Sequence, residues 1–337
     1  MKSLNLTASD QGRINALLSI DDTIALIRAG APLAIAGRPN ALDQLPAGNW
    51  IAGTTPYFMT ADGGRVIDDT QVFVTDFSGL GAVRVVTYDE HHLPQITEDA
   101  PENGFAMAIM PFQSRCHERF ANEASTYPLA FLKPTVGWIA GFDLAEGAAA
   151  AAVYDGANAV RHADRVVVLH IELPAEQCPS IEIINIFEAD GVETIRFEDT
   201  SFAPAHCLIN GERVSFVDYV KRRGREDGQL PLVGDFSGAR INASIRTVEG
   251  DKVQLYAPVF PGIDYAFAGI VPDYVGAFRE AFAAHVQEPA IWSCNCILNF
   301  LFGELEGKVI GGCAGPVTFG EIAYQLVNQT LVQVRAV

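Results

Sequence analysis

The chain has 337 residues, of which 49% are hydrophobic and only 19% are charged, and its formal net charge is −18. A chain of this length and composition can bury a large core, and we expect two domains or two halves that share a sheet system. The negative charge argues against nucleic-acid binding, because a phosphate-binding surface needs clustered Lys and Arg to displace counterions.

In the N-terminal part, helix and strand signals alternate. Residues 19–30 predict a helix, since Ser19 can cap it and Gly30 can end it. Strand patterns occur at 32–37, 49–55, 70–77, 82–88, 164–173, 180–187 and 193–197, with helix patterns at 40–45 and 114–125. This order predicts a mixed α/β fold with mixed or antiparallel sheets flanked by helices, as in a layered α-β-β-α sandwich.

A second unit is predicted from residue 205 onward. Asn210 and Gly211 are a hairpin-turn signal, and a helix pattern follows within residues 209–224. Strand patterns at 238–248 and 252–259 and a helix pattern at 272–286 complete this unit. We therefore expect two domains, at residues 1–204 and 205–337.

Two segments of the sequence resemble each other. NWIAGTTPYFMTADGG, starting at Asn49, and KVIGGCAGPVTFGEI, starting at Lys308, each contain an apolar strand that ends in Gly, at Gly53 and Gly312. Small residues, a Pro, a second Gly-containing turn and a Thr-led strand then follow in both. Two copies of one strand–turn–strand device predict a fold of two related halves.

The C-terminal part resembles the C-terminal module of FIST proteins, which are bacterial sensory domains of intracellular signal transduction. The segments that carry the resemblance are INGERVSFVDYV, INASIRTVEGDKVQLYAPVFPGIDY, SCNC, and GGCAGPVTFGEI with LVNQTLVQV. LAIAG, NWIAGTTPYF and TQVFVTDF resemble the N-terminal module. The resemblance implies a FIST N-like domain at 1–204, a FIST C-like domain at 205–337, and a ligand resembling an amino acid. It also implies action through a signalling protein partner, because no output domain is attached.

The predicted ligand site lies around the glycine-rich turn near the C-terminus. Glycine N–H groups there can face an anion, a carboxylate can lie opposite, and thiols can form the walls. The matching N-terminal residues line the same cavity or a second, pseudo-symmetric one. The predicted ligand-binding residues are Gly53, Thr54, Tyr57, Cys294, Asn295, Gly311, Gly312, Cys313 and Glu321. The alternative is a tight turn between buried strands with simple cross-strand packing. The FIST Ser-Cys strand is followed by a Gly-Arg-type pair that is absent after Cys294, so the resemblance does not carry over the ligand's identity.

Two other functions stay open, namely a cysteine-dependent hydrolase or transferase, and a scaffold without a small ligand. Cys116 adjoins His117, but neighbours on a helix point in different directions, and no G-x-S-x-G motif occurs, so no catalytic residue is predicted. His91 and His92 follow two acidic residues. A solvated loop is favoured there over a metal site, since alternate strand residues face opposite sides.

Targeting and cysteine signals bear on the location of the protein. The first residues, MKSLNLTASDQ, lack the apolar core of a secretory signal, and no stretch reaches the roughly 18 apolar residues of a membrane span. Six cysteines in such a chain are typical of reduced thiols, and Cys294 and Cys296 lack the C-x-x-C spacing of common zinc sites. We expect a soluble cytoplasmic protein, free or as a homo-oligomer, with no membrane partner, no metal and no cofactor.

Overall fold

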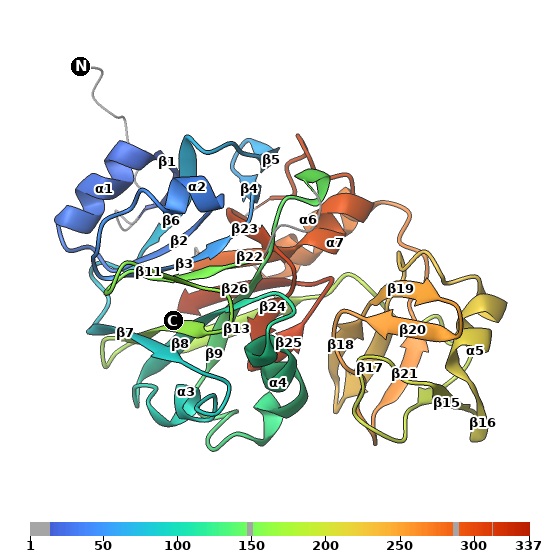
Figure 1. Ribbon diagram of the computed structural model, residues 1–337. Coiled ribbons are helices and arrows are strands. Elements are labelled where there is room, and N and C mark those ends of the chain that lie inside the picture. The colour runs from blue at the N-terminus through green and yellow to red at the C-terminus, as the bar shows by residue number, and fades with distance from the viewer. Residues whose placement is uncertain (1–13, 147–150, 286–289, 312) are drawn as a thin grey trace.

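Figure 1 shows the computed structural model, which describes residues 14–146, 151–285, 290–311 and 313–337. Three six-stranded sheets with helices on their outer sides form a main body, and a smaller unit with its own sheet lies beside it. Each of the three sheets combines one parallel strand pair with antiparallel pairs. The predicted mixed α/β fold is therefore confirmed.

The main body contains three copies of one arrangement, which we call units 1, 2 and 3. Each unit runs through an edge strand, a helix, a second strand, a second helix, a third strand that pairs in parallel with the second, a hairpin and a last strand. Unit 1 comprises β1 (Asn15–Ser19), α1 (Ile20–Arg28), β2 (Leu33–Gly37), α2 (Pro39–Leu42), β3 (Trp50–Thr54), β4 (Tyr57–Thr60), β5 (Gly63–Val66) and β6 (Gln71–Asp76). Unit 2 comprises β7 (Val83–Tyr88), α3 (Gln95–Glu98), β8 (Gly104–Pro111), α4 (Arg115–Glu123), η1 (Ala124–Thr126), β9 (Thr135–Ala140), η2 (Leu144–Glu146), β10 (Val153–Asp155), β11 (Val160–His162) and β12 (Val166–Glu172). Unit 3 comprises β13 (Pro179–Ile184), α6 (Tyr274–His285), β22 (Trp292–Cys296), α7 (Ile297–Phe302), β23 (Gly315–Thr318), β24 (Glu321–Ala323), β25 (Gln325–Val327) and β26 (Leu331–Ala336).

The units exchange their hairpins in a cycle. The strand order is β1-β6-β2-β3 in unit 1, β7-β12-β8-β9 in unit 2 and β13-β26-β22-β23 in unit 3. The hairpin of unit 2 completes the sheet of unit 1, the hairpin of unit 3 completes that of unit 2, and the hairpin of unit 1 completes that of unit 3. The main body thus has pseudo-threefold symmetry, and strands from both sides of residue 205 share two of its three sheets.

The two segments that resemble each other in the sequence occupy equivalent places in units 1 and 3. The strand equivalent to β3 is β23, however, rather than residues 308–312 as predicted, and Gly312 lies outside the described residues. Strand pairing begins at Gly315, where a Cβ atom would lie 1.9 Å from the Ser293 carbonyl oxygen, so the chains approach closely there. Unit 2 adds a third copy to the two that we predicted, and its residues 138–141 repeat the WIAG of residues 50–53.

The ends of β3, β9 and β23 meet where the three units come together. Thr54 donates its hydroxyl to the carbonyl of Gly141 (2.7 Å), and Thr55 donates to the carbonyl of Val317 (2.6 Å). The N–H of Ile139 donates to the carbonyl of Gly320 (2.8 Å). Every pair of units is therefore joined by hydrogen bonds at this centre, and one apolar core lies between the inner faces of the sheets.

The smaller unit, which we call the inserted unit (residues 185–273), interrupts unit 3 between β13 and α6. Its elements are β14 (Ile195–Arg196), β15 (His206–Ile209), β16 (Glu212–Ser215), α5 (Phe216–Arg223), β17 (Leu232–Phe236), β18 (Ala239–Ala243), β19 (Ile245–Glu249), β20 (Lys252–Leu255) and β21 (Asp264–Phe267). It has a separate apolar core and lies to the right of the main body in Figure 1. The predicted strand 238–248 breaks at Ser244, because Ser244 hydrogen-bonds to the Asn328 side chain of the main body.

The helix cap and the hairpin turn that the sequence predicts are both present in the structure. The Ser19 hydroxyl accepts the N–H of Asp22 at the start of α1, and Gly30 follows that helix with φ of +84°. Asn210 and Gly211 both have positive φ in the turn between β15 and β16. These turns and caps formed as predicted because they depend only on neighbouring residues.

Candidate functional site

The structure brings Cys294, Asn295 and Glu321 into one buried polar cluster in unit 3. Each of the three side chains is completely buried. Thr330 donates to one oxygen of Glu321 (2.7 Å), while the other oxygen, Oε1, has no partner among the described residues. The cluster is therefore enclosed by the core and offers no open surface at these atoms.

Burial controls the ionisation of this cluster. It raises the pKa of Glu321 well above the usual range of a carboxyl group, because removal from water disfavours the charged form. Burial also raises the pKa of Cys294 and Cys296 well above that of a free thiol, and that of Cys313 to about 12. Buried, protonated thiols are poor nucleophiles, so this region does not favour cysteine catalysis.

Gly53, Thr54 and Tyr57 of the other predicted residues contribute to packing between units. Gly53 lies in β3, where a Cβ atom would come within 2.8 Å of the Trp138 ring nitrogen, and Thr54 joins units 1 and 2 as described above. The Tyr57 hydroxyl accepts the N–H of Leu144 (3.0 Å). Cys313 lies 3.6 Å from the Ser293 hydroxyl, and Gly311 has φ of +89°. The proposed role of this set in ligand binding stays a prediction.

A cavity of about 270 Å³ lies between the inserted unit and the start of α4, and we call it the polar cavity. Phe112, Gln113, His117 and Glu118 line it from unit 2, and Phe202, Arg246, Gln254, Leu255 and Tyr256 line it from the inserted unit. Gln113, which precedes α4, has φ of +60°, a conformation that is uncommon outside glycine. Cavities between two folded units that carry a few converging polar groups are frequent ligand sites.

The buried ring of His117, which lines this cavity, has one hydrogen-bond donor without a partner among the described residues. Its side chain is 3% exposed, and burial lowers its pKa to about 4, so the ring is neutral at pH 7. Nδ1 accepts the backbone N–H of Gln113 (3.1 Å), which places the ring proton on Nε2. Nε2 has no partner among the described residues, and an unpaired buried donor favours a ligand that accepts its hydrogen bond.

Opposite charges face the polar cavity from its two sides. Arg246 of β19 is half-buried and donates to the Gln254 side chain (2.5 Å), and Glu118 of α4 is exposed. Within the part of the chain that the structure describes, neither residue forms an ion pair. A guanidinium group and a neutral imidazole N–H can bind a carboxylate, and a carboxylate such as Glu118 can bind an ammonium group.

Sequence reasoning missed this cavity. His117 was considered only as a partner for Cys116, and the structure separates the two groups. The Cys116 thiol donates to the carbonyl of Asp164 (3.1 Å), and burial raises its pKa to about 12. No local pattern marks Arg246 or Gln254, because their role depends on a helix more than a hundred positions away in the sequence.

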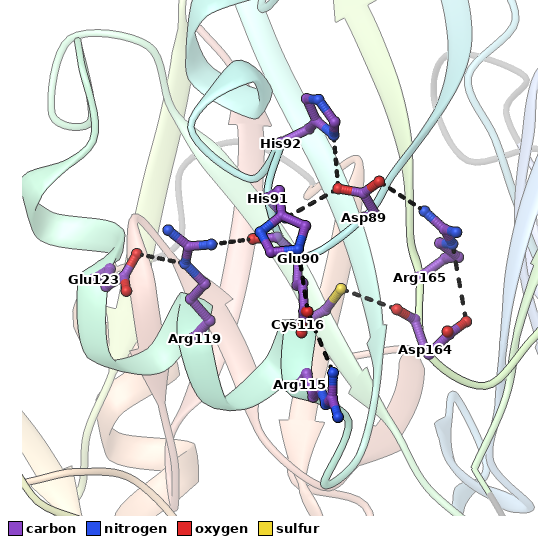
Figure 2. A network of polar contacts seen from close by, with 10 residues as sticks. All are labelled: Asp89, Glu90, His91, His92, Arg115, Cys116, Arg119, Glu123, Asp164 and Arg165. Carbon is purple, nitrogen blue, oxygen red and sulfur yellow. Dashed lines mark hydrogen bonds and ion pairs between the residues drawn. The ribbon is translucent and has the colours of Figure 1, made fainter.

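The acidic and histidine-rich loop at residues 89–92 forms a network of ion pairs, which Figure 2 shows. Asp89 contacts Nδ1 of His92 (2.6 Å) and the guanidinium of Arg165 (3.0 Å). The hydrogen bond from His92 is the main cause that lowers the pKa of Asp89, to about 2. The side chains of His91 and His92 are 72% and 54% exposed, which fits the predicted solvated loop.

The fold and the cavity define a mixed α/β protein with three related units, an insertion in the third, and a ligand-sized cavity where the insertion meets the second. The chain belongs to a family of unknown function (DUF6976), whose model matches residues 18–337. The comparisons with curated proteins and with solved structures gave no match. Among the described residues, no helix combines the length and apolar character needed to cross a bilayer.

Proposed function

We propose that the protein is a cytoplasmic sensory protein that binds a small zwitterion resembling an amino acid in the polar cavity. The observation that carries the proposal is the pair of unpaired opposite charges, Arg246 and Glu118, on the two sides of a cavity that also holds the free donor of His117. The ligand carboxylate binds Arg246 and His117, and the ligand ammonium group binds Glu118. The FIST resemblance points to the same class of ligand.

The position of the cavity supports a role in signalling. A ligand there contacts both the inserted unit and α4, so it stabilises one arrangement of the two units over others. The inserted unit is joined to the main body by two chain crossings, one after β13 and one before α6. A protein partner that binds only one of these arrangements then responds to the presence of the ligand.

The experiment is isothermal titration of the purified protein with the twenty amino acids, small carboxylates and amines. We expect a zwitterion to bind more tightly than the matching carboxylate or amine. Arg246→Gln should weaken binding about 10- to 100-fold, because a hydrogen bond to a charged group contributes about 1.5–3 kcal/mol.

Arg213→Gln is the matched control. Arg213 lies in the same inserted unit, is exposed, and pairs with Glu198 outside the cavity. This variant should bind like the wild type. Equal loss of binding in both variants, or no zwitterion binding by the wild type at millimolar concentration, would contradict the proposal.

A further inference from the structure

A second cavity, of about 690 Å³, continues the border between α4 and the inserted unit, and we call it the apolar cavity. Its apolar lining comes from both sides of that border: Phe131, Ile183 and Tyr324 from the main body, and Phe236, Phe260 and Ile263 from the inserted unit. Phe131 is 63% exposed and its ring lies 6.2 Å from that of Tyr324. A large aromatic side chain so exposed beside a cavity gains from an apolar occupant that covers it.

The two cavities follow one face of α4. His117 and Glu118 line the polar cavity, and Asn122 and Ser125 line the apolar cavity from the next turns of the same helical segment. One helical turn advances only about 5.4 Å, so the linings are neighbours. On the opposite side, Phe202 lines the polar cavity and Thr200, two positions earlier in the chain, lines the apolar one.

We propose that the ligand is a zwitterion with a long unbranched apolar chain, whose charged head binds in the polar cavity and whose chain lies along α4 in the apolar cavity. This inference rests on the proposed function of the polar cavity and adds the class of side chain. The opposite charges of Arg246 and Glu118 set the direction of the ligand, because they fix its carboxylate and ammonium groups at the polar end. The apolar cavity then receives the chain.

The kind of group that the apolar cavity can hold follows from the charges of the residues that line it. The apolar cavity holds aromatic and aliphatic side chains with uncharged polar ones, so it provides no partner for a second charged group on the ligand. A short polar amino acid would leave this lining and Phe131 in contact with water. Each methylene that enters it removes apolar surface from water and should tighten binding about fourfold.

The test is a homologous series of straight-chain α-amino acids: alanine, norvaline, norleucine, 2-aminooctanoate and 2-aminodecanoate. Titration calorimetry of the full chain gives Kd against chain length. We expect Kd to fall by up to about fourfold per methylene until the apolar cavity is filled. Decanoate and decylamine, which each lack one charge of the head, should bind at least tenfold more weakly than 2-aminodecanoate.

Two substitutions test whether the apolar chain of the ligand lies in the apolar cavity, and a third is a control at the protein surface. Phe131→Ser and Ile263→Ser should flatten the dependence of Kd on chain length while alanine binds as to the wild type. Leu132→Ser is the matched control, because Leu132 is 79% exposed beside Phe131 but does not line the apolar cavity. It should keep the wild-type dependence.

The failures of the two proposals differ. If alanine binds through Arg246 but Kd is independent of chain length, the long-chain inference is wrong and the proposed function stands. If no member of the series binds, both are wrong. If chain length matters equally in Arg246→Gln, or if decanoate binds as well as 2-aminodecanoate, the apolar cavity takes apolar molecules without the head group and the inference is overturned. A wild-type dimer that Phe131→Ser dissociates, without any chain-length dependence, would assign the cavity to a second copy instead.

Discussion

Replacement of the buried carboxyl group in unit 3, Glu321→Gln, should change how the stability of the protein depends on pH. In the folded state burial raises the pKa of Glu321 well above its ordinary value of 4.5. The native state therefore keeps a proton that the unfolded state loses above about pH 4.5. Because the native state binds more protons over this range, the free energy of unfolding falls as pH rises.

The size of the effect follows from proton linkage. While the pH lies between the two pKa values, one extra bound proton lowers the free energy of unfolding by about 1.4 kcal/mol per pH unit. For a chain of this length that corresponds to a fall in Tm of about 2 °C per pH unit. Glutamine carries no titrating proton, so the Glu321→Gln protein should lack this component of the pH dependence.

Urea unfolding at pH 5, 6, 7 and 8, followed by tryptophan fluorescence, measures the difference. All three tryptophans, Trp50, Trp138 and Trp292, are buried in the main body with exposures of 1% or less, so they report on the part that contains Glu321. Glu304→Gln is the control, since that side chain is 85% exposed. Parallel curves for the wild type and Glu321→Gln would refute the reasoning, because they would show that Glu321 ionises normally in the fold.

Three further predictions test other parts of the structure. Gly141→Ala should lower the free energy of unfolding by about 1–3 kcal/mol, because the new Cβ would lie 1.9 Å from the Phe319 ring. Gly269→Ala is the control and should be nearly neutral in the same urea unfolding experiment, because the nearest atom to its new Cβ is 3.8 Å away. A thiol reagent should label the native protein once, at the exposed Cys178, and six times after denaturation; faster labelling of a second thiol would contradict the burial of the other five. Nitrogen-15 spectra of the histidine rings should show His117 neutral and protonated on Nε2 at pH 7, without titration above about pH 5 because its pKa is lowered to about 4; a midpoint near 6.5 would mean that the ring is solvated.

The parts of the fold that the sequence predicts are those decided by neighbouring residues. The Ser19 cap, the turn at Asn210 and Gly211, and strands such as β2, β6 and β12 follow from short patterns of side chains, whereas β8 and β9 were not predicted. The similarity between units 1 and 3 was also predicted from the sequence, whereas the third copy was not, although WIAG occurs at both 50–53 and 138–141. The pairing of each hairpin with another unit could not be predicted from the sequence, because alternating patterns define a strand and its buried face but not the strand with which it pairs.

The candidate site was out of reach of sequence reasoning for the same reason. The glycines and the carboxylate near Glu321 predict a site there, whereas the structure buries the Glu321 side chain completely in the core. The polar cavity combines His117 of unit 2 with Arg246 of the inserted unit, and neither stands in a recognisable motif. A ligand site between two folded units depends on how those units pack, and this packing cannot be predicted from any single segment of the sequence.

The exchange of hairpins explains why the insertion meets unit 2. In the sequence the inserted unit lies within unit 3, between β13 and α6. In space it faces α4, which belongs to unit 2. The hairpin of unit 3 lies at the edge of the unit 2 sheet, and its outer strand β25 contacts both α4 and β18 of the inserted unit. In unit 1 the equivalent helix α2 is preceded instead by Arg38, whose guanidinium pairs with Asp143. The interrupted copy in the pseudo-threefold body thus creates a cleft beside α4 of unit 2, and the charges left unpaired in that cleft are those that a zwitterion can satisfy.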